Sequence, residues 1–273
     1  MEFYEVTVKD YRIINEILEE NYNFSLNDYA TIYVRRVLAK IINSGIAKNL
    51  QDLHIKLYEK SIEKEELMSF FWVETTELFR DPSVWRFLAK FLKKKKEILK
   101  TRIWFPLCVD MMELYSLLIL LKILGLEKTV EVIVNIPIGK YFNEVGSNFV
   151  VPYKLMEISE GNFRRLELKT PFVLEDFFEN NGDFYSIKTS FSTAVKFIKG
   201  LETQKPKRSV NIIMYRNKML YYTLSKSIDI VNTLSESLLL GGLLFIGVNE
   251  RLLVYNENMF SAIDVNDGIY KRK

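Results

Sequence analysis

The sequence predicts an α/β protein in which a helical N-terminal domain precedes a domain built on a parallel β-sheet. Two observations carry this prediction. From residue 8 to residue 98, apolar side chains recur at helical spacing. After residue 100, apolar runs follow the order strand, helix, strand, which is typical of a parallel sheet. These runs lie at 103–107, 112–124 and 130–136. In a chain of 273 residues we therefore expect domains at 1–98 and 99–273.

Capping residues predict where the helices of the first domain begin and end. Ser25, with the acidic Asp28 three residues later, is expected to cap one helix, and Gly45 is expected to end it. Asn49 is expected to cap the next helix. The later helices are predicted from Asn49 to about Glu59, from Glu63 to about Trp72, and from Asp81-Pro82 to the lysine run 93–96.

In the second domain, the alternation of strands and helices is expected to be interrupted once and then to resume. Residues 149–158 and 163–169 flank the glycine-containing loop 159–162, a pattern that predicts a β-hairpin. The elements expected after it are a strand at 184–187, a helix at 190–201, a strand at 210–215, a helix at 225–239, a turn at Gly241-Gly242 into a buried strand, and edge segments at 251–255 and 259–265 that pair with each other.

Composition narrows the classes of function. The net charge of +3 gives no reason to expect a nucleic-acid partner. The one histidine, His54, excludes a multi-histidine metal site, and we expect no metal. The one cysteine, Cys108, excludes an internal disulfide and fits a reducing, cytoplasmic location. The longest apolar stretch, 111–126, contains Glu113 and Lys122, so we expect a buried core helix and no membrane insertion.

Five local patterns follow one another along the chain. They are Tyr29-Ala-Thr-Ile-Tyr-Val-Arg-Arg-Val-Leu-Ala-Lys40, Thr75-Thr-Glu-Leu-Phe-Arg-Asp-Pro82, the segment from Trp104 through Glu113-Leu-Tyr-Ser116, Tyr215-Arg-Asn-Lys-Met-Leu-Tyr-Tyr222, and Leu240-Gly-Gly-Leu-Leu-Phe-Ile-Gly-Val-Asn-Glu250. Each pattern is weak by itself. Together, and at similar spacing, they resemble the chemoreceptor glutamate methyltransferases of bacterial chemotaxis, the CheR family, over nearly the whole chain.

The resemblance implies an architecture and an activity. It implies that a Rossmann-like methyltransferase domain follows the helical domain, with a small antiparallel β-subdomain inserted at about 145–172, where the hairpin is expected. The family transfers a methyl group from S-adenosylmethionine to glutamate side chains on receptor helices. Because a carboxylate is already ionised at neutral pH, this transfer needs positioning more than acid–base help.

Several positions match residues that the family places around its cofactor and reacting groups. By this resemblance, Thr76, Arg80, Glu113 and Asn217 would contact the cofactor, and Arg80 and Tyr221 would act in catalysis. Arg80 could orient a carboxylate through paired hydrogen bonds, or it could pair with a nearby acid in a purely structural role. Tyr221 could equally be packing below a strand end.

Other positions depart from the family pattern. Leu107 and Met111 stand where the family has small residues, chiefly glycine, that let the backbone approach the cofactor. Asn135 stands where an acidic residue grips the ribose hydroxyls, and an amide there would cost about 1 kcal/mol of binding. Glu74 replaces the usual asparagine and Lys218 an apolar residue. Leu107 and Met111 argue more strongly against cofactor binding than Asn135 does, because a side chain that blocks the cofactor excludes it, whereas a weaker hydrogen bond only lowers its affinity.

Three functions therefore stay open. The favoured one is an impaired or inactive family member that acts by binding a protein partner, with S-adenosylmethionine or S-adenosylhomocysteine bound only if the pocket is open. Arg35, Arg36 and Lys40 would form a basic face toward the acidic helical region of a chemoreceptor, or they are ordinary surface charges. The second function is an active methyltransferase with an unusual pocket. The third is a small-molecule sensor or dimerising module on the same fold.

Overall fold

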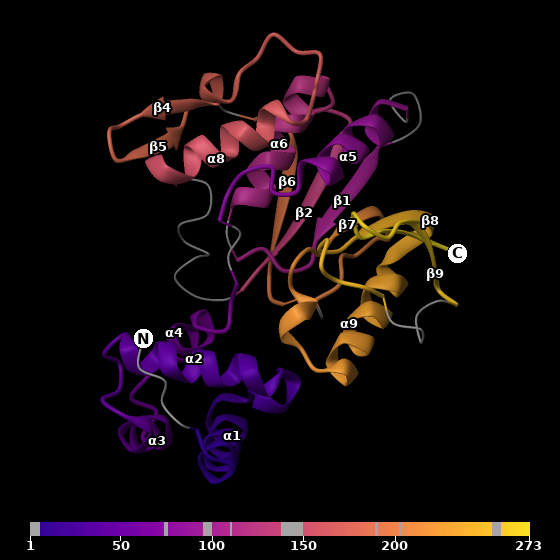
Figure 1. Cartoon of the computed structure of the whole chain (residues 1–273). Coiled ribbons are helices and arrows are strands. Elements are labelled where there is room, and N and C mark those ends of the chain that lie inside the picture. The colour runs from indigo at the N-terminus through magenta and orange to yellow at the C-terminus, as the bar shows by residue number, and fades with distance from the viewer. Residues whose placement is uncertain are drawn as a thin grey trace. The chain divides into compact units, whose positions relative to one another are not determined.

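The computed structural model describes residues 6–73, 76–94, 100–109, 111–137, 150–188, 191–201, 204–252 and 258–273 (Figure 1). The chain divides into two compact units. The smaller one comprises Met1–Val73 and Lys218–Asp229, and the larger one Glu74–Asn217 and Ile230–Lys273. This division differs from the boundary expected near residue 98, because the helix that follows Asp81 packs within the larger unit.

The smaller unit is helical, as the apolar spacing predicts. Its described elements are α1 (Val8–Tyr22), η1 (Leu26–Asp28), α2 (Thr31–Asn43), α3 (Leu50–Tyr58), α4 (Lys64–Ser69), η3 (Met219–Tyr221) and the first turns of α9 (Leu224–Ser237). Thr7 and Asp10 form a reciprocal capping box at the start of α1. Leu18, Leu38 and Leu53, from three different helices, are buried in one apolar core.

The predicted caps of the smaller unit are partly confirmed. Asn49 accepts a hydrogen bond from the backbone of Asp52 and caps α3, and Gly45 follows α2 with a φ of +84°. The role expected for Ser25 is wrong. Its hydroxyl accepts from the backbone N–H of Asn27 and caps η1, whereas α2 begins only at Thr31 with no side-chain cap.

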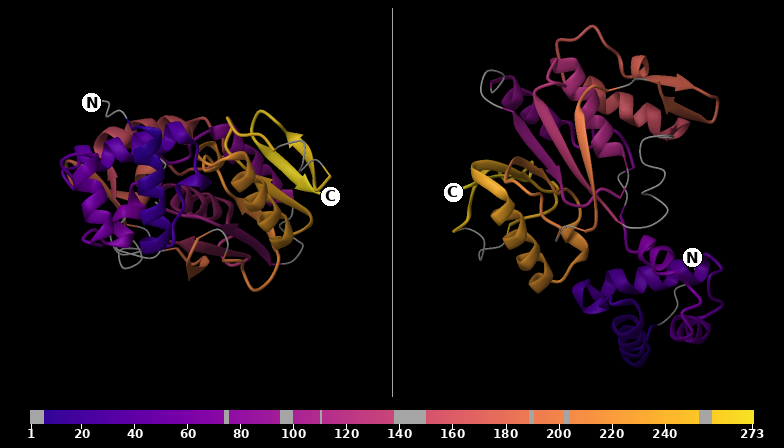
Figure 2. Two further views of the ribbon diagram at one scale, coloured as in Figure 1. Left: turned by 90° about the horizontal axis from the view of Figure 1, so that it is seen from below. Right: turned by 180° about the vertical axis from the view of Figure 1, so that it is seen from behind.

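The larger unit is built on a seven-stranded, mostly parallel sheet. The strands are β1 (Thr101–Phe105), β2 (Val130–Ile136), β6 (Ala194–Lys199), β7 (Val210–Met214), β8 (Leu238–Phe245), β9 (Phe260–Asp264) and β10 (Ile269–Arg272). Their order is β6-β2-β1-β7-β8-β10-β9. All neighbours are parallel except β10, which runs antiparallel to both β8 and β9 at the C-terminal edge (Figure 2).

One face of this sheet shares a core with three helices. They are α5 (Pro82–Lys94), α6 (Met112–Leu124) and α8 (Tyr153–Arg164). Ile103, Val132 and Phe245 point into this core from their strands, because side chains alternate between the two faces of a strand. Helix α6 is buried around most of its circumference, which explains why its sequence is apolar on all sides. The expected buried helix is therefore confirmed.

A second, three-stranded antiparallel sheet has the order β3-β5-β4, from β3 (Val150–Pro152), β5 (Phe184–Ile187) and β4 (Phe178–Asn180). The hairpin expected at 149–158 and 163–169 is wrong. Pro152 ends β3 and precedes α8, whose buried residues Met156, Ser159 and Phe163 recur at helical spacing. An antiparallel insertion is present, but it is assembled from later segments than expected.

Three further predictions of the second domain need correction. Residues expected as a helix at 190–201 contain β6, whose pairing with β2 runs from Glu131 opposite Ala194 to Ile136 opposite Lys199. The turn expected at Gly241-Gly242 lies inside β8, where the pairing with β7 shifts register. The partner of β9 is β10, whereas Arg251 and Leu252 are not in a strand and 253–257 lie outside the described residues.

Candidate functional site

The strand order of the larger unit marks one place as the expected ligand site. From β1 the chain continues to β2 on one side, and β7 later pairs with β1 on the other side. In open α/β sheets, ligands bind beyond the carboxyl ends of the strands where the order reverses in this way. The segments that follow β1, β2, β7 and β8 are therefore the candidate site.

A buried arginine holds this edge together. Arg216, two residues after β7, has a fully buried side chain that donates 2.8 Å to Glu113 on the first turn of α6 and 2.6 Å to Asp81. The guanidinium also lies 5.9 Å from the ring centre of Trp85. A buried cation is tolerated only when it is paired and hydrogen-bonded, and here two carboxylates supply the pairing. We name Arg216, Glu113 and Asp81 the Arg216 cluster.

The Arg216 cluster also supports an unusual turn. Phe79 and Asp81 have φ angles of +53° and +57°, a backbone region that residues other than glycine rarely adopt. Arg216 donates 3.1 Å to the carbonyl oxygen of Arg80, which lies between them, and Trp85 donates 3.0 Å to the same oxygen. These bonds compensate the strained turn that leads into α5.

A second buried carboxylate organises the segments after β7 and β8. Glu250 Oε2 accepts from the backbone N–H of Asn217 at 3.0 Å and from that of Gly247. A Cβ atom on Gly247 would lie 2.4 Å from the side-chain oxygen of Asn217, so this close approach requires glycine. Asn217, matched by resemblance to a cofactor contact, is thus held against β8 with a φ of +57°.

The loop after β1 is packed with side chains. Leu107, Cys108 and Val109 are all buried, and the backbone of Cys108 donates 2.9 Å to the carbonyl oxygen of Asn135. Met111 is half-buried and packs against the core, while Asp110 lies outside the described residues. Leu107 is thus buried, and Met111 turns its side chain to the core of the larger unit.

The amide of Asn135 is completely used inside the protein. Its nitrogen donates 2.8 Å and 2.7 Å to the carbonyl oxygens of Leu201 and Gln204, and its oxygen accepts from Trp104 Nε1 at 2.8 Å. Asn135 is fully buried. In this structure Asn135 does not fit the role of binding a ribose, because it is shielded from solvent and both of its N–H donors are already bonded.

The other predicted cofactor contacts lie in different surroundings. Glu113 is buried and its charge is paired within the Arg216 cluster. Thr76 is exposed and its hydroxyl donates to Glu77, while the Arg80 Nε lies 3.9 Å from the other oxygen of Glu77. Arg80 thus has the nearby acidic partner that its structural interpretation requires.

Tyr221 lies in the smaller unit. Its ring centre is 4.5 Å from that of Tyr33, and its carbonyl oxygen accepts from the backbone of Ala30 at 2.9 Å. Tyr33 donates 2.9 Å to the carbonyl oxygen of Phe71, and burial, with a smaller effect from Tyr221, raises the pKa of the Tyr33 hydroxyl. Lys218 belongs to the same unit and donates 3.0 Å to the carbonyl oxygen of Val73.

The predicted partner-binding residues are all exposed on α2. Arg35, Arg36 and Lys40 lie on adjacent stripes of the helix, and Lys40 sits 5.6 Å from the ring centre of Phe70. Glu74, one of the altered positions, lies outside the described residues.

Sequence reasoning missed the residues that organise the site: Arg216, Asp81 and Glu250. Arg216 left a usable signal, since it directly follows the apolar run of β7 and a charge in such a place needs a buried partner. The acids that supply this pairing come from positions 103 and 135 residues away in the chain. Local pattern could not identify them.

The described residues set two further limits. Within those ranges, side chains of His, Cys, Asp and Glu nowhere gather in threes that could hold a metal ion. Over the same ranges, every helix falls short of the length and apolar character needed to cross a bilayer.

Comparison with known sequences shows what the chain is similar to. The family model described as "CheR methyltransferase, SAM binding domain" matches residues 74–269. Two similar curated proteins are both named chemotaxis protein methyltransferase. The one from Listeria innocua serovar 6a is 23% identical over 270 residues, covering 96% of this chain and 97% of the relative. The one from Listeria monocytogenes serovar 1/2a is 22% identical over 277 residues, with the same coverage.

Solved structures are more distant. MNMC2 from Aquifex aeolicus is 16% identical with a TM-score of 0.33, and the match covers 64% of this chain and 51% of that one. An O-methyltransferase family protein from Burkholderia thailandensis is 6% identical with a TM-score of 0.29, covering 70% and 43%.

Proposed function

Because the chain belongs to the CheR methyltransferase family, we propose that it is a protein-glutamate methyltransferase homologue with lost or weakened S-adenosylmethionine binding, acting by binding a protein partner. The observation that carries this proposal is that the side chain of Asn135 is fully buried and hydrogen-bonded within the protein. Turning its amide toward ribose hydroxyls would break its hydrogen bonds to two backbone carbonyl groups and to Trp104. The loop after β1 supports the same proposal, since it carries the bulky residues Leu107 and Met111 at positions where the resemblance implies glycine.

The alternative is an active S-adenosylmethionine-dependent methyltransferase of glutamate side chains on chemoreceptors. The ordered packing of Asn217 against Gly247 and Glu250 favours it, because the segments after β7 and β8 keep a defined shape. Glu113 does not decide between the two functions. Its pairing with Arg216 gives it a structural role that would be retained with or without catalysis.

The partner that fits best is an acidic helical region of a chemoreceptor. Arg35, Arg36 and Lys40 are exposed on one helix, and basic side chains at such spacing attract an acidic helix through charge complementarity. This attraction would steer association and weaken as salt rises.

Titration of the full chain with a fluorescent, glutamate-rich helical fragment of a chemoreceptor tests this function. We expect binding that weakens at least about tenfold when Arg35, Arg36 and Lys40 are all changed to Gln, as losing several complementary charges requires. Arg12→Gln, which removes an exposed charge on α1 of the same unit, is the matched control and should leave binding nearly unchanged. Equal weakening by the control, or no binding at low salt, would refute the partner assignment.

A further inference from the structure

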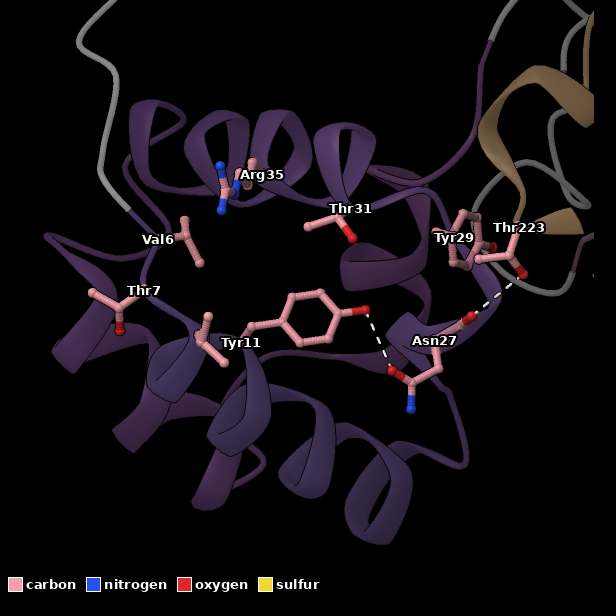
Figure 3. A pocket seen from close by; sticks show the side chains of 9 residues that line it. Val6, Thr7, Tyr11, Asn27, Tyr29, Thr31, Arg35 and Thr223 are labelled. Carbon is pink, nitrogen blue, oxygen red and sulfur yellow. Dashed lines mark hydrogen bonds between the residues drawn. The ribbon is translucent and has the colours of Figure 1, made fainter.

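We propose that the helical unit contains a second site, a pocket between α1 and α2 that binds a small organic monocarboxylate with an aromatic or branched apolar body. The pocket has a volume of about 340 Å³ and is lined from the start of α1, the segment around η1, the first turns of α2 and Thr223 (Figure 3). That volume is near the lower end of the range of about 300–1,000 Å³ that is typical of ligand pockets. All of its described lining residues belong to the smaller unit, and a ligand bound there would require neither cofactor nor methyl transfer.

The charge of the lining selects an anion. Among the described residues that line the pocket, Arg35 is the only one with a charged side chain, and it lies over the pocket from helix α2. Within the described part of the chain, its guanidinium has neither an ion-pair nor a hydrogen-bond partner. An unpaired arginine beside a cavity favours a carboxylate, because its planar fork matches the two oxygens.

Uncharged donors surround the same space. Thr31 precedes Arg35 by one helical turn, so both side chains face the pocket, and the Thr31 hydroxyl has no partner among the described residues. Tyr11 points across the cavity and donates to the side-chain oxygen of Asn27 at 3.5 Å, a long and weak hydrogen bond. A ligand oxygen could therefore accept from Arg35, Thr31 and Tyr11 at small cost to existing bonds.

The surroundings favour one negative charge over two. Asp10 and Asp28 are close in sequence to lining residues, and both are already engaged, Asp10 with Thr7 and Asp28 with Lys226 at 2.8 Å. A dianion such as a phosphate monoester would have only Arg35, among the described lining residues, to balance its two charges. A monocarboxylate matches the single cation.

The remaining walls favour an apolar body on the ligand. Val6 and Tyr29 are buried and line the pocket, and Val8, which also lines it, is 84% exposed. The ring of Tyr11 extends from the side of Val6 toward Asn27. A ring or branched chain that covers Val8 and Tyr11 would remove apolar surface from water.

Calorimetric titration of the full chain with phenylacetate tests the pocket, with phenylacetamide as the neutral isostere and inorganic phosphate as the simple anion. We expect phenylacetate to bind and the other two probes to bind at least about tenfold more weakly, because each lacks either the charge or the apolar body. Arg35→Gln should weaken phenylacetate binding at least about tenfold. Thr31→Leu should also weaken it, by filling the cavity while keeping the charge.

Arg36→Gln is the matched control, since Arg36 is the adjacent exposed arginine and does not line the pocket. It should leave phenylacetate binding unchanged. Circular dichroism of each variant verifies that it is folded. Equal loss in the Arg35 and Arg36 variants, or equal binding of phosphate or phenylacetamide, would overturn the proposal. So would an acidic receptor peptide that requires Arg35 while phenylacetate does not bind at all, which would assign Arg35 to the partner surface alone.

Discussion

Arg216 and Glu113 form a buried ion pair, 2.8 Å between Nη1 and Oε1, that joins the segment after β7 to the first turn of α6. The two residues belong to two of the sequence patterns that resemble the CheR family. Because this ion pair stabilises the fold, both residues have a structural role that does not depend on cofactor binding. Retention of these motifs therefore says little about whether the cofactor is still bound.

Removing the arginine should destabilise the larger unit strongly. Arg216→Met leaves the buried Glu113 without its cation, and we expect a loss of about 3–5 kcal/mol in the free energy of unfolding. Denaturant titration measures this change. The exposed pair of Arg164 with Glu160 supplies the control, since Arg164→Met should cost at most about 1 kcal/mol. Similar losses in the two variants would contradict the central place of the Arg216 cluster.

Restoring the family's carboxylate at the ribose position should damage the protein. Asn135→Asp removes both donors to Leu201 and Gln204 and places a buried carboxylate beside two carbonyl oxygens, so we expect a loss of at least about 2 kcal/mol in stability. Thermal unfolding measures this change.

The control for Asn135→Asp is Asn211→Asp. Asn211 accepts a hydrogen bond from the backbone of Arg102 through its side-chain oxygen, an interaction that a carboxylate keeps. This variant should be close to wild type. An Asn135→Asp protein of wild-type stability would show that the bonds to Leu201 and Gln204 are dispensable.

A methyl group at Gly247 should disturb the segments after β7 and β8. The new Cβ would meet the side-chain oxygen and backbone nitrogen of Asn217 at 2.4 and 2.9 Å, so we expect Gly247→Ala to cost about 1–3 kcal/mol. Gly161→Ala lies in helix α8 with open space around it and should stabilise by about 0.5–1 kcal/mol. Unfolding curves of the two variants that shift in the same direction would refute this comparison.

Acid should weaken the contact between β2 and β6. A hydrogen bond from Lys196 lowers the pKa of Glu131 below its ordinary value of 4.5. The stability that the pair contributes is therefore present above that value and is lost as the pH falls through the lowered pKa of the folded state. We expect Glu131→Gln to lower the free energy of unfolding near neutral pH by no more than about 1 kcal/mol, because Lys196 is largely exposed, and to have no effect in strong acid. A difference that grows on acidification would contradict this assignment.

Much of the fold could be predicted because strong local patterns coincide with the final structure. The run from β1 through α6 to β2 is apolar and long enough to identify each element. The failures lie where tertiary pairing decides. Strand β6 is a half-exposed edge strand whose sequence lacks a buried stripe, and only its pairing with β2 makes it a strand. Helix α8 was mistaken for a hairpin because its loop-like glycine, Gly161, sits inside the helix.

The candidate site could be located from sequence, but its chemistry could not. The order of the motifs placed it at the strand ends. The sequence did not reveal the hydrogen-bond partners of each polar side chain. The two carbonyl groups that bind the Asn135 amide, for example, come 66 and 69 residues later in the chain. Likewise, the pairing of Arg216 depends on residues from two distant helix starts. Such contacts are set by the fold and leave no local pattern.

Calorimetric titration of the full chain with S-adenosylhomocysteine tests the proposed function most directly. Because Asn135 is buried with both donors bonded, and because Leu107 and Met111 stand where the resemblance implies glycine, we expect no detectable binding at high ligand concentration. Binding at micromolar Kd or tighter, with about one site per chain, would contradict the proposal and support the active methyltransferase.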